Sequence, residues 1–336
     1  MNDFRGVFPI LPTPFLPDES IDIGSFEHMI ERMVGLRVDG VTILGVLGEA
    51  NRLTDRERTE LVDAAVQTAD GRIPVVVGTS HNGTRATAEL AASAKRQGAD
   101  AVMVTPHKEP APSERRIFDH FQAVAAATDL PIVLQDHPGS TDVHMSVELV
   151  LNMVREIPSI ACIKQEALPS PPRIATLKAA LGRHVPILTG LGALYGGFEL
   201  KAGADGFMTG FAFPEILKAM VAASADDAWR IYAKCLPLIV FENQPGVAIR
   251  KEVFRRRGLI AHSVVRAPGA GISPAAALQL DELLKRTFGA RDLSEQQGPS
   301  EFLGQRAAKA KLGDLERYLT GTPDIPPVPG DEPPPD

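Results

Sequence analysis

Short apolar runs rich in β-branched residues recur along the first two thirds of the chain and predict its strands. They are "GVFPIL" near 6–11, "VTIL" 41–44, "PVVV" 74–77, "AVMV" 101–104, "PIVL" 131–134, "IACIK" 160–164, "VPIL" 185–188 and "GFM" 206–208. Each run is apolar throughout instead of alternating with polar residues. This is typical of strands that are buried on both faces of a parallel sheet.

The segments between these runs carry apolar residues three or four positions apart, which is the spacing of an amphipathic helix. One segment opens on Thr54 with Glu57 three residues later, the pattern of a capping box. Another opens on Ser146 before an apolar stripe. Pro214 stands where the first turn of a further helix is expected, and proline suits that turn because an N–H there would have no helical partner.

Eight strand–helix units before about residue 223 predict an α/β fold, the (β/α)8 TIM barrel. A doubly wound sheet is the alternative, but it usually has fewer strands and a glycine-rich loop after the first, where this chain has "PTPF". The strand pattern then ends, and helical runs follow near 226–241, 245–257, 274–288 and 301–320. We therefore expect three parts: a barrel over residues 1–224, a C-terminal helical region over 225–320, and a disordered, proline-rich acidic tail over 321–336.

Composition narrows the class of protein. The chain has 336 residues and a formal net charge of −7, which argues against a nucleic-acid partner. No apolar run approaches the roughly 20 residues of a membrane span, and the N-terminus lacks the pattern of a secretory signal. We expect the two cysteines, Cys162 and Cys235, to be reduced core thiols, and no zinc-type spacing occurs. These features predict a cytoplasmic protein that uses neither a metal nor a cofactor and has no membrane partner.

The sixth apolar run ends on Lys164, at a place where barrels gather their functional residues. Cys162 and Lys164 are two residues apart and point to the same side of the strand. If that side is the barrel interior, loss of water disfavours the ammonium form, and a neutral amine is the nucleophile that forms an imine with a carbonyl. From position alone, a lysine that ends a strand by reaching into solvent is an equally good interpretation.

Several segments, in order and spacing, resemble the dihydrodipicolinate synthase / N-acetylneuraminate lyase family over roughly residues 4–290. They are "FRGVFPILPTPF", "LGVLGEANRLTDRER", "PVVVGTSHNGTRATAELAASAKRQGADAVMVTPH", "LPIVLQDHPG", "IACIKQE" and "GADGFMTGFAFPE". The family consists of (β/α)8 class I lyases of 2-oxo acids such as pyruvate, with an imine-forming lysine in an "IK" at the end of strand six. The resemblance implies that Lys164 forms a Schiff base and that the chain is a homo-oligomer, a dimer or a tetramer.

The chain departs from the family at several positions of the active site. The family's "GTTGE" reads "GVLGE", so Val46 and Leu47 replace two threonines that help to hold the substrate carboxylate and relay protons. The family's tyrosine ending strand five aligns with Gln135, whose amide is neither an acid nor a base at neutral pH. The synthases' arginine for the second substrate aligns with Ser140, and an aromatic residue after strand four aligns with His107.

Other residues near the strand ends are candidates for the missing proton relay. We rank His137 first, because it follows the vacated tyrosine position and imidazole titrates nearest to neutral pH. Glu166 is second and His107 third, while Asp136 and Tyr195 are weaker candidates. The positions expected to contact the substrate are Val46, Leu47, His107, Gln135, Gly190 and Thr209.

Two charged features receive no catalytic role at this stage. The resemblance implies that Glu49 is mainly structural. The segment "RKEVFRRRG", residues 250–258, is predicted to be a solvated basic helix face or a subunit contact.

Two classes of function remain open from the sequence. The first is an enzyme, a lyase of aldolase or dehydratase type that acts on a 2-oxo acid through Lys164. The second is a barrel that binds a small metabolite or is structural, with catalysis impaired by the loss of the relay, and a weak dihydrodipicolinate synthase lies between the two. The retained lysine favours the enzyme.

Overall fold

Eight parallel strands form the centre of the molecule, hydrogen-bonded in the order β1-β8-β7-β6-β5-β4-β3-β2. The structure, a computed structural model, describes residues 3–110, 113–181, 185–244, 246–289 and 292–294. A parallel bridge between Ile10 and Thr42 joins the segment after β1 to β2 and closes the barrel. The strands are β1 Gly6–Val7, β2 Val41–Ile43, β3 Val75–Gly78, β4 Ala101–Val104, β5 Ile132–Asp136, β6 Ile160–Gln165, β7 Ile187–Thr189 and β8 Gly206–Phe207. The predicted (β/α)8 barrel is confirmed.

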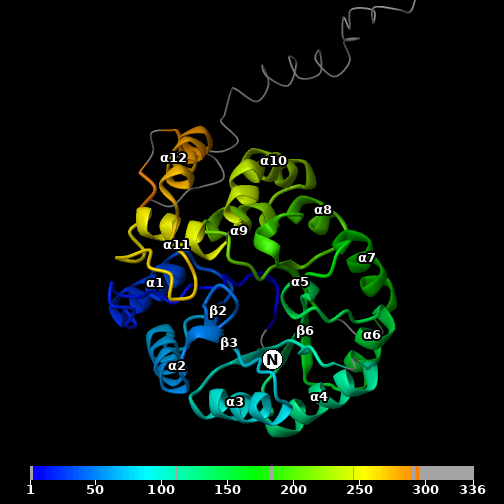
Figure 1. The fold of residues 1–336 in the computed structure, drawn as a ribbon. Helices are drawn as coiled ribbons and strands as arrows, with labels where there is room; N and C mark the ends of the chain where they lie inside the picture. The colour runs from blue at the N-terminus through cyan, green and yellow to red at the C-terminus, as the bar shows by residue number, and fades with distance from the viewer. Residues whose placement is uncertain (1–2, 111–112, 182–184, 245, 290–291, 295–336) are drawn as a thin grey trace, which may run out of the picture. The chain divides into compact units, whose positions relative to one another are not determined.

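Helices surround these strands, as Figure 1 shows. The helices of the βα units are α1 Ile23–Gly35, α2 Asp55–Ala69, α3 Thr84–Arg96, α4 Glu114–Ala127, α6 Val147–Glu156, α7 Ser170–Ala180, α8 Gly196–Lys201 and α9 Pro214–Ala222. The loops after the strands contain shorter elements: α5 Pro138–Thr141, η1 Ala50–Arg52 and η2 Leu191–Ala193. The capping box expected at Thr54 and Glu57 is present, and Ser146 caps α6 by accepting from Leu149 N–H.

Three helices follow the barrel in the described chain: α10 Ala225–Glu242, α11 Val247–Arg256 and α12 Pro274–Phe288. They coincide with three of the expected helical runs and belong to the same compact unit as the barrel. The fourth run, near 301–320, and the tail from 321 lie outside the described residues. None of the described helices is long and apolar enough to cross a membrane.

The barrel interior is packed with buried side chains, which explains why the strands read as continuous apolar runs. The cluster includes Phe8, Ile10, Leu47, Met103, Val133, Cys162, Leu188 and Met208. Because Cys162 points into this cluster, the alternation along β6 directs Lys164 to the same side, one step nearer the carboxyl end of the strand.

Two cations of the basic segment over residues 250–258 are buried, so a solvated face is the wrong interpretation for them, while a subunit contact stays a prediction. Lys251 and Arg257 are 0% and 2% exposed. Lys251 pairs with Glu49, and Arg257 pairs with Glu215 at 2.6 Å. A buried charge requires a partner, and here the partners are glutamates far away in the sequence. Glu49 therefore anchors α11 to the loop after β2, in line with its expected structural role.

Candidate active site

Lys164 lies at the carboxyl end of β6 and is only 4% exposed, so a lysine that reaches into solvent does not describe it. Its Nζ is 3.1 Å from Glu166 Oε2. The same carboxylate oxygen accepts a hydrogen bond of 2.6 Å from Gln135 Nε2. An amine, a carboxylate and an amide are thus in direct contact in a buried part of the barrel.

The sheet brings these three residues together. Gln135 on β5 is in register with Lys164 on β6. Glu166 directly follows β6, and its N–H donates to Asp136 O at 2.9 Å, which continues the strand pairing beyond Gln165. The other carboxylate oxygen, Glu166 Oε1, accepts from Leu191 N–H at 3.0 Å. Strand pairing and the loop after β7 therefore fix the carboxylate from two sides.

Gly190 supplies the space for this carboxylate. A Cβ atom at Gly190 would lie 1.9 Å from Glu166 Oε1 and 2.5 Å from its Cγ. Gly190 was expected to contact the substrate. The structure shows why a glycine is needed here: a side chain at this position would collide with Glu166 beside the lysine.

The electrostatics of the cluster favour a charged glutamate. Burial alone would raise the pKa of the Glu166 carboxyl, but Lys164, His137 and the Gln135 amide together hold this pKa below its ordinary value. Burial lowers the pKa of His137, and the attraction of Glu166 opposes that effect only in part. At neutral pH the site therefore contains a carboxylate base and a neutral imidazole.

His137 lies beside the cluster but is engaged elsewhere. Its Nδ1 is 2.7 Å from Ser140 Oγ and 3.8 Å from Glu166 Oε2. Asp136 points the other way, because successive residues of a strand alternate in direction. Its Oδ2 accepts from Arg173 Nη2 at 2.7 Å, so the carboxylate is part of an ion pair between β5 and α7.

The loops after β2 and β8 contain three of the positions expected to contact the substrate. Val46 is exposed, whereas Leu47 is buried in the interior cluster and has no polar atom on its side chain. Thr209 is buried, and its Oγ1 accepts from Gly192 N–H at 2.7 Å, which holds the loop after β7 against the end of β8.

A cavity of about 550 Å³ opens over the ends of β2, β3, β4 and β5. Its lining includes Val46, His107 and Gln135. A space of this size holds a small metabolite, and it reaches the amide that contacts Glu166. Val46, His107 and Gln135, three of the residues expected to bind substrate, therefore lie on one cavity.

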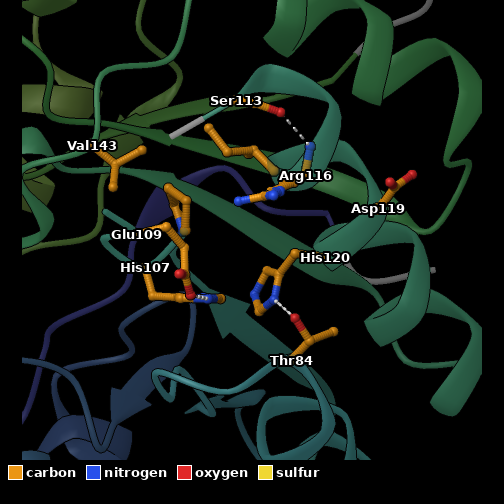
Figure 2. A pocket seen from close by; sticks show the side chains of 10 residues that line it. Thr84, His107, Glu109, Ser113, Arg116, Asp119, His120 and Val143 are labelled. Atoms are coloured by element: carbon orange, nitrogen blue, oxygen red, sulfur yellow. Dashed lines mark hydrogen bonds and ion pairs between the residues drawn. The ribbon is translucent and has the colours of Figure 1, made fainter. Parts of the chain in front are cut away.

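His107 also borders a second cavity, of about 400 Å³, between the loop after β4 and helices α3 and α4 (Figure 2). His107 Nε2 is 3.1 Å from Glu109 Oε1, and its ring packs edge-on against His120. His120 Nδ1 forms a hydrogen bond of 3.0 Å with Thr84 Oγ1. Lys164 does not line this cavity.

Tyr195 is the N-cap residue of α8, in the loop after β7. Tyr232, on α10, donates from its hydroxyl to Leu194 O at 2.6 Å in the loop after β7. Sequence reasoning missed Arg250. A Cβ atom at Gly192, in the same loop, would lie 2.2 Å from Arg250 Nη2. No group of three or more His, Cys, Asp or Glu side chains in the described chain is arranged to hold a metal ion.

Comparisons with known proteins agree with this geometry. The family model described as "Dihydrodipicolinate synthetase family" matches residues 3–287. An L-2-keto-3-deoxyarabonate dehydratase from Azospirillum brasilense is 33% identical over 291 residues, which cover 84% of this chain and 94% of that protein. A 4-hydroxy-tetrahydrodipicolinate synthase from Salinibacter ruber is 36% identical over 231 residues, 67% of this chain and 74% of that protein.

Solved structures give the same result. The crystal structure of a dihydrodipicolinate synthase from Rhodopseudomonas palustris superimposes with a TM-score of 0.80 at 35% identity, covering 84% of this chain and 97% of that one. The match of the family model and the similarity of the relatives extend over the barrel and most of the C-terminal helices. The chain therefore belongs to the dihydrodipicolinate synthetase family.

Proposed function

We propose that this chain is a dehydratase of 2-keto-3-deoxy sugar acids, which works through an imine on Lys164 with Glu166 as the base. The observation that carries the proposal is the contact of Glu166 Oε2 with both Lys164 Nζ and Gln135 Nε2, at 3.1 and 2.6 Å. The similarity to a 2-keto-3-deoxyarabonate dehydratase supports the choice of substrate class.

The position of Glu166 favours elimination of water over cleavage of a carbon–carbon bond. Once the lysine nitrogen is bonded to C2 of the substrate, C3 is two bonds from that nitrogen and within reach of a carboxylate that contacts it. Cleavage between C3 and C4 instead requires a base at the C4 hydroxyl. This chain has no tyrosine at the end of β5 to act as that base. Gln135 is found there, and an amide does not accept a proton at neutral pH.

The proposed steps balance as follows. Lys164 adds to the C2 carbonyl and one water leaves, giving a protonated imine. Glu166 removes a proton from C3, and the electron pair moves into the C2–C3 bond to form an enamine. The C4 hydroxyl then leaves as water after it receives a proton from Glu166, which took that proton from C3. Addition of water to the remaining imine releases the dehydrated 2-oxo acid and frees the lysine.

Glu166→Gln tests this proposal, because the amide keeps the shape and loses the base. We expect imine formation with pyruvate, trapped by borohydride and measured as added mass at Lys164, to persist. Turnover of 2-keto-3-deoxyarabonate should fall by about 10²–10⁴-fold, the usual contribution of a positioned base. Glu156→Gln, a surface change at the end of α6, is the matched control. Formation of pyruvate and an aldehyde in place of a dehydrated acid, or full turnover in Glu166→Gln, would contradict the proposal.

A further inference from the structure

A 2-oxo acid brings a negative charge into the buried end of the barrel, and the cluster around the lysine does not balance it. Glu166 is itself an anion, and Gln135 and His137 are neutral. The loop after β2 offers the apolar side chains of Val46 and Leu47. An anion that loses its water without a cationic or hydrogen-bonding partner is strongly disfavoured, so the site requires a cation other than the lysine that becomes the imine.

Arg250, on α11, reaches the loops that follow two neighbouring strands, β7 and β8. A Cβ atom at Gly192, after β7, would lie 2.2 Å from Arg250 Nη2. A Cβ atom at Gly210, after β8, would lie 3.6 Å from Arg250 Cδ and 2.4 Å from Leu47 Cδ2, which belongs to the loop after β2. Gly192 therefore leaves space for the guanidinium, and Gly210 leaves space for Leu47.

The partners of Arg250 satisfy its charge only in part. Its Nη2 donates to Asn243 Oδ1 at 2.9 Å, but Nε is 3.7 Å from Glu242 Oε2, beyond hydrogen-bond distance. Within the described residues, this buried Nε has no hydrogen-bond partner. Burial raises the pKa of Glu242 to about 7 against the attraction of Arg250, so this carboxyl is only partly ionised at neutral pH.

Arg250 is also within electrostatic range of the imine site. Burial lowers the pKa of its guanidinium, and Glu242 and Glu166 both oppose that effect. Other buried cations near the strand ends are engaged in closer ion pairs, Arg173 with Asp136 and Lys251 with Glu49.

We propose that Arg250 binds the carboxylate of the 2-oxo acid and so replaces the two hydroxyls that the "GVLGE" loop lacks. The planar guanidinium presents parallel N–H groups that match the two oxygens of a carboxylate. This assignment rests on the proposed imine chemistry at Lys164, and it makes Arg250 the residue that selects acids over uncharged ketones.

The test measures imine formation and does not depend on turnover. Wild-type protein and the variants Arg250→Met, Arg250→Lys and Arg255→Met are trapped with borohydride at increasing concentrations of pyruvate, and the mass added at Lys164 is measured. The series is repeated with hydroxyacetone, which has the ketone but no carboxylate. Arg255 is on the same helix and pairs with Glu252 at the surface, so its loss is a matched control.

We expect Arg250→Met to need about 10- to 100-fold more pyruvate for half-maximal trapping, the usual effect of losing a charged hydrogen-bonding partner. The pyruvate concentration that Arg250→Lys needs should lie between those of the wild type and Arg250→Met. Arg255→Met should need the same concentration as the wild type. Trapping by hydroxyacetone should not change. An unchanged requirement for pyruvate in Arg250→Met would overturn the assignment, and so would a parallel loss for both ketones at an unchanged melting temperature. If Arg250→Met does not fold, Arg250→Lys decides the question by the same ratio.

The two proposals fail separately. If the wild type traps pyruvate but dehydrates no 2-keto-3-deoxy acid, the proposed function is wrong, and the trapping series still decides the role of Arg250. If turnover is found but the pyruvate requirement does not depend on Arg250, only the carboxylate assignment is wrong. If the wild type traps no 2-oxo acid, both proposals are wrong.

Discussion

At the scale of single residues, Gly190 is a position where one added carbon should displace the carboxylate beside Lys164. The Cβ of an alanine would lie 1.9 Å from Glu166 Oε1, so the carboxylate would have to move away from Lys164.

We expect Gly190→Ala to lose about 10²-fold in turnover, the lower range for a displaced acid or base, while the melting temperature shifts by only a few degrees. Gly35→Ala is the control, because a Cβ there meets nothing within 4 Å. Equal turnover in Gly190→Ala and the wild type would show that the contact of Glu166 with the lysine is not required.

The pH profile separates the two candidate bases. The pKa of Glu166 is held below its ordinary value, so this base stays ionised as the pH falls from 7 to 5. We therefore expect kcat/KM to be level over that interval and His137→Ala to cost only about 10-fold, below the range for a principal base. A fall in kcat/KM with an apparent pKa between 5 and 6.5 that disappears in His137→Ala would transfer the role to His137, our first choice from the sequence.

At the scale of elements, the predictable features are those encoded by neighbours in the chain. The strands could be predicted because burial on both faces requires continuous apolar runs, and the cap at Thr54 because its partner is three residues away. Lys164 and Glu166 are two residues apart at the end of β6, and this spacing places both on one side of the strand. The hydrogen bond between Gln135 and Glu166 could not be predicted from the sequence, because it depends on the register between β5 and β6.

The burial of α11 was missed for the same reason. Its Lys251 meets Glu49, some two hundred positions earlier in the chain, and a run of basic residues looks like a surface when the partners are so distant. A buried glutamate in an apolar segment is the signal that could have suggested a buried cation.

This ion pair leads to a prediction for the element as a whole. Lys251→Met should lower the free energy of unfolding by about 2–3 kcal/mol, below the roughly 3–5 kcal/mol for a fully orphaned buried charge, because Arg52 still contacts Glu49 at 2.6 Å. The double variant Glu49→Gln with Lys251→Met removes both charges of this ion pair. It should therefore recover part of the lost stability. Urea unfolding measures both, and a double variant less stable than Lys251→Met would contradict the explanation.

At the scale of the whole molecule, the stability of the fold depends on how its buried charges titrate. Glu199 on α8 is 1% exposed and accepts from Ser170 Oγ at 2.5 Å. Burial raises the pKa of Glu199 to about 7. At another place in the fold, burial lowers the pKa of His120 to about 4. The two groups affect stability in opposite directions as the pH changes. The expected dimer or tetramer stays a prediction at this scale.

A comparison of variants isolates the glutamate. Because the pKa of Glu199 is raised from 4.5 to about 7 on folding, the folded state binds the proton more tightly. The stability from this group is complete below pH 4.5 and is lost as the pH rises to 7. Glu199→Gln removes the titration, whereas any hydrogen bond it loses costs the same at every pH. The stability of Glu199→Gln relative to the wild type should therefore improve from pH 5 to pH 7.5, by up to about 3 kcal/mol. Urea unfolding at both pH values gives this difference, and a relative stability that does not change with pH would show that Glu199 is ionised in the folded protein throughout.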